Sequence, residues 1–135
     1  MHGQCLCGAV RIQTTTVTTL NVCHCGMCRR WGSGAFVSTE STQVDITGKD
    51  LIQHYASSTW ASRSFCQQCG THLYYQLNAD QHTYYLNAQL FDLELPIEVA
   101  QEIYTDHKPA YYPFFSIQSK KMTQQDVESL FAGGD

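Results

Sequence analysis

The chain of 135 residues has little proline, little charge and no long apolar run, and each shortage excludes a class of protein. Its three prolines and nine glycines are scattered, so no linker or low-complexity tract is expected. Eight basic residues against twelve acidic ones give a net charge of -4, without the basic stripe of a nucleic-acid-binding protein. We therefore expect no nucleic-acid partner.

The N-terminal stretch MHGQCLCGAV lacks the basic start, apolar core and cleavage site of a signal peptide. No apolar run is long enough to span a membrane, so we expect a cytoplasmic protein with no membrane partner. Disulfides rarely persist in that reducing compartment. The seven cysteines therefore indicate metal binding or catalysis.

Short runs that alternate apolar and polar residues recur along the chain and predict strands. They are AVRIQTTTV, GAFVST, QVDIT, DLIQHYAS, THLYYQL, HTYYLNAQL and IEVAQEIYT. The last run also fits a helical face, but we interpret it as a strand. We therefore predict an all-β protein: one zinc-stapled domain over residues 1–135, built of short, mostly antiparallel strands.

One helix is expected at the C-terminal end. Thr123 can cap a first turn that carries Asp126, with one apolar face behind it and a glycine as the stop. The apolar face and the stop are Val127, Leu130, Phe131 and Gly133.

The cysteines fall into groups of two, three and two. In CQQCGT, Cys66 and Cys69 have the spacing in which a tight turn directs two thiolates at one ion, and Gly70 can complete that turn. In CLCG, Cys5 and Cys7 lie two residues apart and face the same side of an extended chain. Together these four predict a closed structural zinc site, with buried free cysteines as the alternative reading.

The middle group, CHCGMC, contains Cys23, Cys25 and Cys28. We expect the first two on one face of an extended segment, with Gly26 allowing a turn that brings Cys28 to the same ion and His24 pointing away. Three thiolates would leave the fourth zinc position open, as in catalytic sites. Two alternatives stay open: a redox switch, or closure by one of His54, His72, His82 and His107.

A zinc ion that carries three thiolates is a weak Lewis acid, and we expect its fourth ligand to be another sulfur atom. The sequence therefore indicates carbon–sulfur chemistry. Arg29 and Arg30 follow the cysteines and could bind carboxylates of an anionic thiol, or could be a solvated pair.

Aromatic residues offer further candidates. Trp31 and Trp60 could line a pocket or belong to the core. The segment HKPAYYPFF, residues 107–115, reads as an ordered loop that covers either a pocket or a sheet edge, and His107 in it is a candidate for proton transfer.

The ordered motifs GQCLCGAVR, CHCGMCRRW and RSFCQQCGTHL resemble those of the glutathione-dependent formaldehyde-activating enzyme family, which also contains centromere protein V. The resemblance implies an all-β zinc fold with two zinc ions per chain. It implies a structural zinc on Cys5, Cys7, Cys66 and Cys69, and a catalytic zinc on Cys23, Cys25 and Cys28. The chain departs from the commoner family pattern at KPAYYPFF, where a tryptophan often follows the proline-containing segment.

The cysteine spacing predicts a zinc-dependent enzyme of carbon–sulfur chemistry, and the resemblance implies a carbon–sulfur lyase that acts on glutathione or a related thiol and an aldehyde. The thiol would take the open zinc position, lose its proton and add to the aldehyde carbon. The alternatives are a non-enzymatic zinc-stabilised interaction module, and a hydrolase or dehalogenase that uses zinc-bound water.

Overall fold

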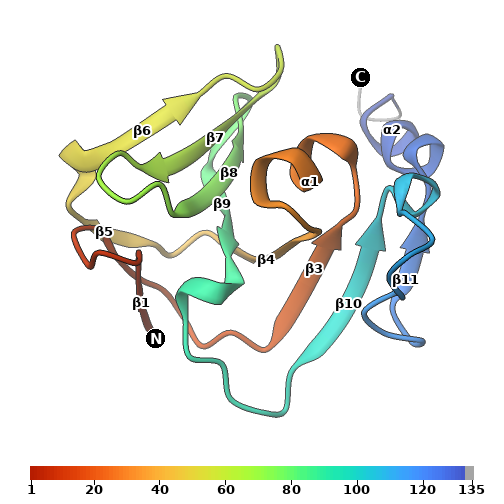
Figure 1. Ribbon diagram of the computed structural model, residues 1–135, viewed down its shortest axis with the longest axis horizontal. Helices are drawn as coiled ribbons and strands as arrows, with labels where there is room; N and C mark the ends of the chain where they lie inside the picture. The colour runs from red at the N-terminus through yellow and green to blue at the C-terminus, as the bar shows by residue number, and fades with distance from the viewer. Residues whose placement is uncertain (133–135) are drawn as a thin grey trace. The chain divides into compact units, whose positions relative to one another are not determined.

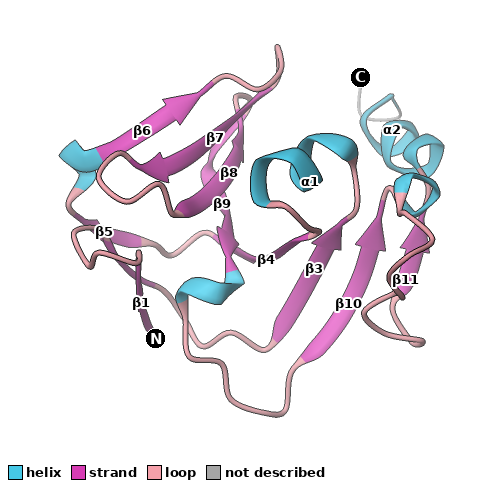
Figure 2. Ribbon diagram, in the orientation of Figure 1, coloured by secondary structure: helices cyan, strands magenta, loops and turns pink. Residues whose placement is uncertain are grey.

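β-Strands dominate the computed structural model, which describes residues 1–132 (Figures 1 and 2). The chain divides into two compact units. The first comprises Met1–Thr18 and Ser38–Ile97, and the second comprises Thr19–Val37 and the segment that begins at Glu98. Within the described part of the chain, no helix is long and apolar enough to cross a membrane.

The first unit contains a three-stranded antiparallel sheet of β1 (His2–Gln4), β2 (Arg11–Gln13) and β5 (Asp45–Thr47). The alternation predicted for residues 9–17 is seen in β2, where one buried residue lies between two exposed ones. The strand ends earlier than the pattern suggested, at Gln13, and the next residue, Thr14, has its hydroxyl 2.7 Å from Ser41 Oγ.

A second antiparallel set of strands completes this unit. β4 (Phe36–Ser41) pairs through its residues 38–41 with β9 (Asp80–Asn87), followed by β8 (His72–Leu77), β7 (Ala61–Cys66) and β6 (Ile52–Tyr55). Two short 3-10 helices, η1 (Lys49–Leu51) and η2 (Ala88–Leu90), lie between strands. The strands expected from the alternating runs here are confirmed, and β1 and β7 are additional.

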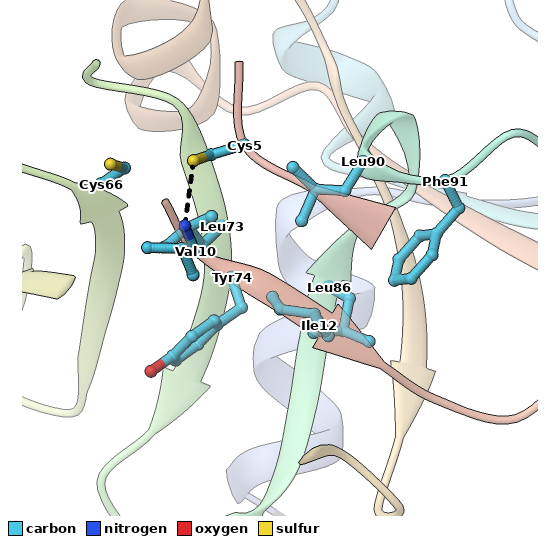
Figure 3. Close-up of a cluster of buried hydrophobic side chains, with 9 residues drawn as sticks. All are labelled: Cys5, Val10, Ile12, Cys66, Leu73, Tyr74, Leu86, Leu90 and Phe91. Carbon is cyan, nitrogen blue, oxygen red and sulfur yellow. Dashed lines mark hydrogen bonds between the residues drawn. The ribbon is translucent and has the colours of Figure 1, made fainter. Parts of the chain in front are cut away.

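The core of this unit gathers side chains from both sets of strands (Figure 3). Ile12, Leu73 and Leu86 are fully buried, and each stabilises the unit by about 1.5–3 kcal/mol relative to an exposed position. Cys5 and Cys66 are buried in the same cluster. The core therefore supports one side of the predicted four-cysteine site.

The second unit differs, because its strands run parallel. β10 (Glu98–Ile103) pairs in parallel with β3 (Thr19–Cys23) and with β11 (Lys120–Met122). The ambiguous run at 97–105 is thus a strand. The unit also holds helix α1 (Gly26–Gly32), the 3-10 helix η3 (Thr105–His107) and helix α2 (Gln124–Ala132).

Helix α2 confirms the expected C-terminal helix and its cap. Asp126 N–H donates to Thr123 Oγ1 at 3.2 Å, and Thr123 N–H donates to Asp126 Oδ2 at 2.9 Å. Val127 is buried, but Leu130 and Phe131 are exposed within this unit. The predicted stop at Gly133 lies outside the described residues.

Candidate metal centre and active site

The four cysteines predicted to form a structural site come together in the first unit. Their sulfur atoms all lie within 4.8 Å of one another; Cys66 is the last residue of β7, and the other three lie in the segments that follow β1 and β7. The Sγ atom of Cys7 lies 3.6 Å from that of Cys5 and 3.9 Å from that of Cys66. A tetrahedral zinc ion with bonds of ~2.3 Å would place its sulfur ligands ~3.8 Å apart. The four-thiol cluster of Cys5, Cys7, Cys66 and Cys69 therefore fits a zinc ion.

Local backbone conformation builds both turns. Gly8 and Gly70 each have φ of +79°, a left-handed conformation that favours glycine. Leu6 N–H donates to Thr71 Oγ1 at 3.0 Å, which joins the two turns. Val10 N–H donates to Cys5 Sγ at 3.3 Å (Figure 3). The turn predicted at Gly70 is confirmed, and Gly8 adopts the same conformation in the other turn.

The pKa values of two thiols in this cluster are shifted in opposite directions. Burial raises the pKa of Cys69, but the hydroxyl and backbone N–H of Thr71 and the backbone N–H of Cys7 outweigh it and lower that pKa to about 5. The N–H of Ala9 lowers the pKa of Cys7, but burial and the neighbouring thiols raise it to about 11. The cluster is therefore already part thiolate at neutral pH.

The second cluster, here called the three-thiol cluster, consists of Cys23, Cys25 and Cys28. Their sulfur atoms lie within 4.8 Å of one another. Cys23 is the last residue of β3, and Cys25 caps helix α1, where its Sγ accepts from Cys28 N–H at 3.4 Å. The chain turns at Gly26 and brings Cys28 to this group, as expected, but the turn is the first one of a helix, which the sequence pattern did not predict. Seven residues with glycine at both ends give too weak a helical pattern to predict.

In the residues that the structure describes, three thiols and no histidine make up this group. Of the histidines proposed to close it, His54 instead contacts Ser64 Oγ at 2.6 Å. His107 contacts Gln124 Oε1 at 2.7 Å, in an exposed position. The three-thiol cluster therefore has the donor set of an open zinc site, without a fourth protein ligand from this unit's residues 19–37 and 98–132.

Mutual contact raises the pKa of Cys23, through hydrogen bonds with Cys25 and Cys28 and then through burial. Three adjacent thiols resist ionising together, since each thiolate repels the next. A divalent cation removes that resistance. The donor chemistry of the cluster therefore fits zinc.

The two arginines lie beside the cluster on α1. Arg29 donates from Nε to the backbone oxygen of His24 at 3.1 Å, and Arg30 is exposed. Neither guanidinium forms an ion pair with a carboxylate in residues 1–132. Trp31 packs against Phe36, with ring centroids 5.6 Å apart. Trp60 is mostly exposed in the other unit.

Sequence reasoning missed a buried hydrogen-bonded pair of side chains beside the cluster. His24 Nε2 lies 2.8 Å from Glu102 Oε1, and both side chains are fully buried. The loop at 107–115 reaches this pair, because Tyr112 Oη lies 3.0 Å from His24 Nδ1. The sequence held only a weak signal, since Glu102 is one of several polar residues of β10, and its burial, which requires a partner, is seen only in the structure.

A second missed residue, Tyr104, directly follows β10. Its φ of +54° is in the left-handed region, which is uncommon for a residue other than glycine. Burial raises the pKa of Tyr104, and the charges of Cys23 and Cys25 raise it further.

Three comparisons relate this chain to known proteins. The model of the family described as glutathione-dependent formaldehyde-activating enzyme matches residues 1–107, which include all seven cysteines. A Schizosaccharomyces pombe protein named as an uncharacterized lyase is 32% identical over 131 residues, 96% of each chain. A crystal structure of a Rhodobacter sphaeroides protein has a TM-score of 0.59 at 23% identity, covering 74% of this chain and 100% of that one. This last likeness concerns the fold alone.

Proposed function

Because the chain belongs to the glutathione-dependent formaldehyde-activating enzyme family, we propose that it is a zinc-dependent carbon–sulfur lyase. Its substrates would be glutathione or a related thiol and an aldehyde, as in S-hydroxymethylglutathione synthesis. The family model and the lyase-named relative support a lyase-like role. The three-thiol cluster is the feature of this chain that supports the finer assignment.

The observation that carries the proposal is the unequal division of seven thiols. Four surround one position, and three surround the other. A structural zinc site is normally closed by four protein ligands, whereas a catalytic one keeps a position for substrate. Zinc held by Cys23, Cys25 and Cys28 would favour the thiolate form of a substrate thiol at neutral pH.

The proposed reaction balances without an oxidant or reductant. The sulfur of the thiol forms a bond to the aldehyde carbon, and the carbon–oxygen double bond becomes a single bond. The proton that leaves the thiol ends on that oxygen as a hydroxyl group. The reverse reaction breaks the carbon–sulfur bond and releases thiol and aldehyde.

The arginines are proposed to orient the anionic part of the thiol. Arg30 is exposed on α1, and Arg29 is held at its Nε by the backbone of His24. A guanidinium presents several donors to a carboxylate in a fixed planar geometry. Since neither arginine is neutralised by a carboxylate of the described residues, both retain charge for an anionic substrate.

We further propose that residues 1–135 act as one functional domain and that the protein works in the cytoplasm. The family match runs through segments of both units, which supports the first statement. Two sites built from cysteine thiols suit a reducing compartment, where thiols stay available for metal.

Replacement of Cys25 by serine tests the proposal. An open catalytic site predicts that Cys25→Ser abolishes thiol-dependent aldehyde consumption, lowers the zinc content from two ions to one and leaves the urea midpoint nearly unchanged. A marked loss of stability would instead favour a second structural zinc in a non-enzymatic module. Turnover by the wild-type protein without any thiol would favour hydrolysis by zinc-bound water.

A further inference from the structure

The carboxylate of Glu102 accepts four hydrogen bonds within the second unit. It is fully buried, and both of its oxygens accept two hydrogen bonds. Oε1 accepts from His24 Nε2 at 2.8 Å and from Phe115 N–H at 3.0 Å. Oε2 accepts from Ser119 Oγ at 2.6 Å and from Ser116 N–H at 3.2 Å. Glu102 therefore ties β10 both to His24 and to the segment that precedes β11.

Each polar group of His24, in turn, forms a hydrogen bond. Its N–H donates to Ile103 O at 3.1 Å, and its backbone oxygen accepts from Arg29 Nε at 3.1 Å. Its ring nitrogens contact Glu102 at 2.8 Å and Tyr112 Oη at 3.0 Å. An ionised carboxylate only accepts hydrogen bonds, so Nε2 of His24 carries the proton that is donated to Glu102. The hydrogen bond between Nδ1 and Tyr112 Oη accounts for the other ring nitrogen.

Aromatic rings enclose the same histidine. The ring centroids of Phe114 and Phe115 lie 5.9 Å and 6.0 Å from that of His24. The side chain is fully buried as a result. A residue held at four polar points and packed on its faces has little conformational freedom left.

This immobilised residue lies between two of the three thiols. Cys23 and Cys25 flank His24 directly, so any rotation of its backbone would move both sulfur atoms. Groups that hold metal ligands in place without binding the metal themselves orient those ligands, and their loss weakens metal binding.

We propose that Glu102, acting through His24, positions the three-thiol cluster for metal binding. Both are positioning residues, because they hold the ligand backbone and contact neither metal nor substrate. The same histidine orients Arg29 through its backbone oxygen, so one buried pair sets the ligands and one arginine together. This inference rests on the proposed function in one respect, namely that a metal ion occupies the three-thiol cluster.

Cobalt titration tests the proposal, with Co²⁺ replacing zinc in the full chain. The thiolate-to-cobalt absorption lost in Cys25→Ser identifies the signal of the three-thiol cluster. His24→Gln keeps an amide donor for Glu102 but removes the ring and the contact with Tyr112. We expect it to weaken cobalt binding at this cluster by about 10-fold and to leave the four-thiol cluster unchanged.

Ser119→Ala is the matched control. It removes one hydrogen bond to Glu102 Oε2, on the side away from His24, so it should lower stability without altering cobalt affinity at either cluster. An equal effect of His24→Gln and Ser119→Ala on cobalt affinity would show a merely structural role and overturn the proposal.

A second variant covers the case in which His24→Gln does not fold. Tyr112→Phe removes only the hydroxyl that contacts His24, and it should weaken cobalt binding at the three-thiol cluster alone. Unchanged affinity in this variant overturns the proposal. A wild-type protein that binds one cobalt ion in total overturns the proposed function as well. Two cobalt ions with unaffected variants overturn the positioning role only.

Discussion

Replacing Glu102 by glutamine should destabilise the protein by about 2–5 kcal/mol at neutral pH. The carboxylate accepts four hydrogen bonds, whereas an amide offers one oxygen and one NH₂ donor. Two of the four donors therefore face another donor. Each buried donor left without an acceptor costs about 1–3 kcal/mol, set against a typical total stability of about 5–15 kcal/mol.

The size of this effect should depend on pH in a defined direction. Burial raises the pKa of Glu102, but hydrogen bonds from Phe115 N–H, Ser119 and His24 outweigh it, so the pKa is lowered overall. Lys121 Nζ, 3.8 Å from Oε2, is the other charged group beside it. A lowered pKa means that the stabilisation is fully present above the ordinary glutamate value of about 4.3. It is lost as the pH falls through the lowered, folded-state value.

Urea unfolding of the zinc-loaded wild type and variants over a pH series measures this contribution. Acid also strips zinc from thiolates, so the informative quantity is the difference in unfolding free energy between proteins at each pH. The difference between wild type and Glu102→Gln should shrink in acid. Ser119→Ala retains the carboxylate, so its own unfolding free energy should keep part of the pH dependence that the wild type shows. A glutamine variant as stable as the wild type at neutral pH would refute the reasoning.

Three further predictions follow from individual contacts. Arg30→Ala should raise the KM for glutathione by about 2- to 5-fold at low salt, and leave that for an uncharged thiol unchanged in the same steady-state assay. Gly48→Ala should cost about 2–4 kcal/mol in urea unfolding, since φ is +86° and the new Cβ would lie 2.2 Å from Ala9 O. In the matched control, Gly34→Ala, the new Cβ would have no other atom within 4 Å, so the same measurement should show a cost under about 0.5 kcal/mol. Cys66→Ser should remove one zinc ion by metal analysis and destabilise the fold by more than about 3 kcal/mol, because this thiol is fully buried.

Much of the first unit could be predicted from local patterns. The alternation in HTYYLNAQL and THLYYQL is strong enough to indicate β9 and β8, which form an antiparallel pair. In contrast, β1 and β7 gave weaker signals, since β1 has only three residues and the segment of β7 is rich in small and polar residues. Their strand state depends on pairing with the adjacent strands, β2 for β1 and both β6 and β8 for β7.

The second unit was less predictable. Parallel pairing of β10 with β3 and β11 cannot be inferred from alternation, which gives no strand direction. Helix α1 was missed as well, because a seven-residue helix depends on tertiary contacts more than on its own propensity. The three thiols nevertheless meet, since the helical turn places Cys28 over Cys25 as well as the expected turn would have done.

The sequence by itself determined the two thiol turns of the four-thiol cluster and the grouping of the other three cysteines. Spacings of two to five residues, with glycine beside them, leave the backbone few ways to direct the sulfur atoms. Only the tertiary structure decided which distant groups support them. Glu102 lies 78 residues from His24 along the chain, and the two meet because the parallel register of β10 on β3 places Glu102 opposite Val22 and Ile103 opposite Cys23. That register is set by packing and backbone hydrogen bonds between strands, which no local spacing encodes.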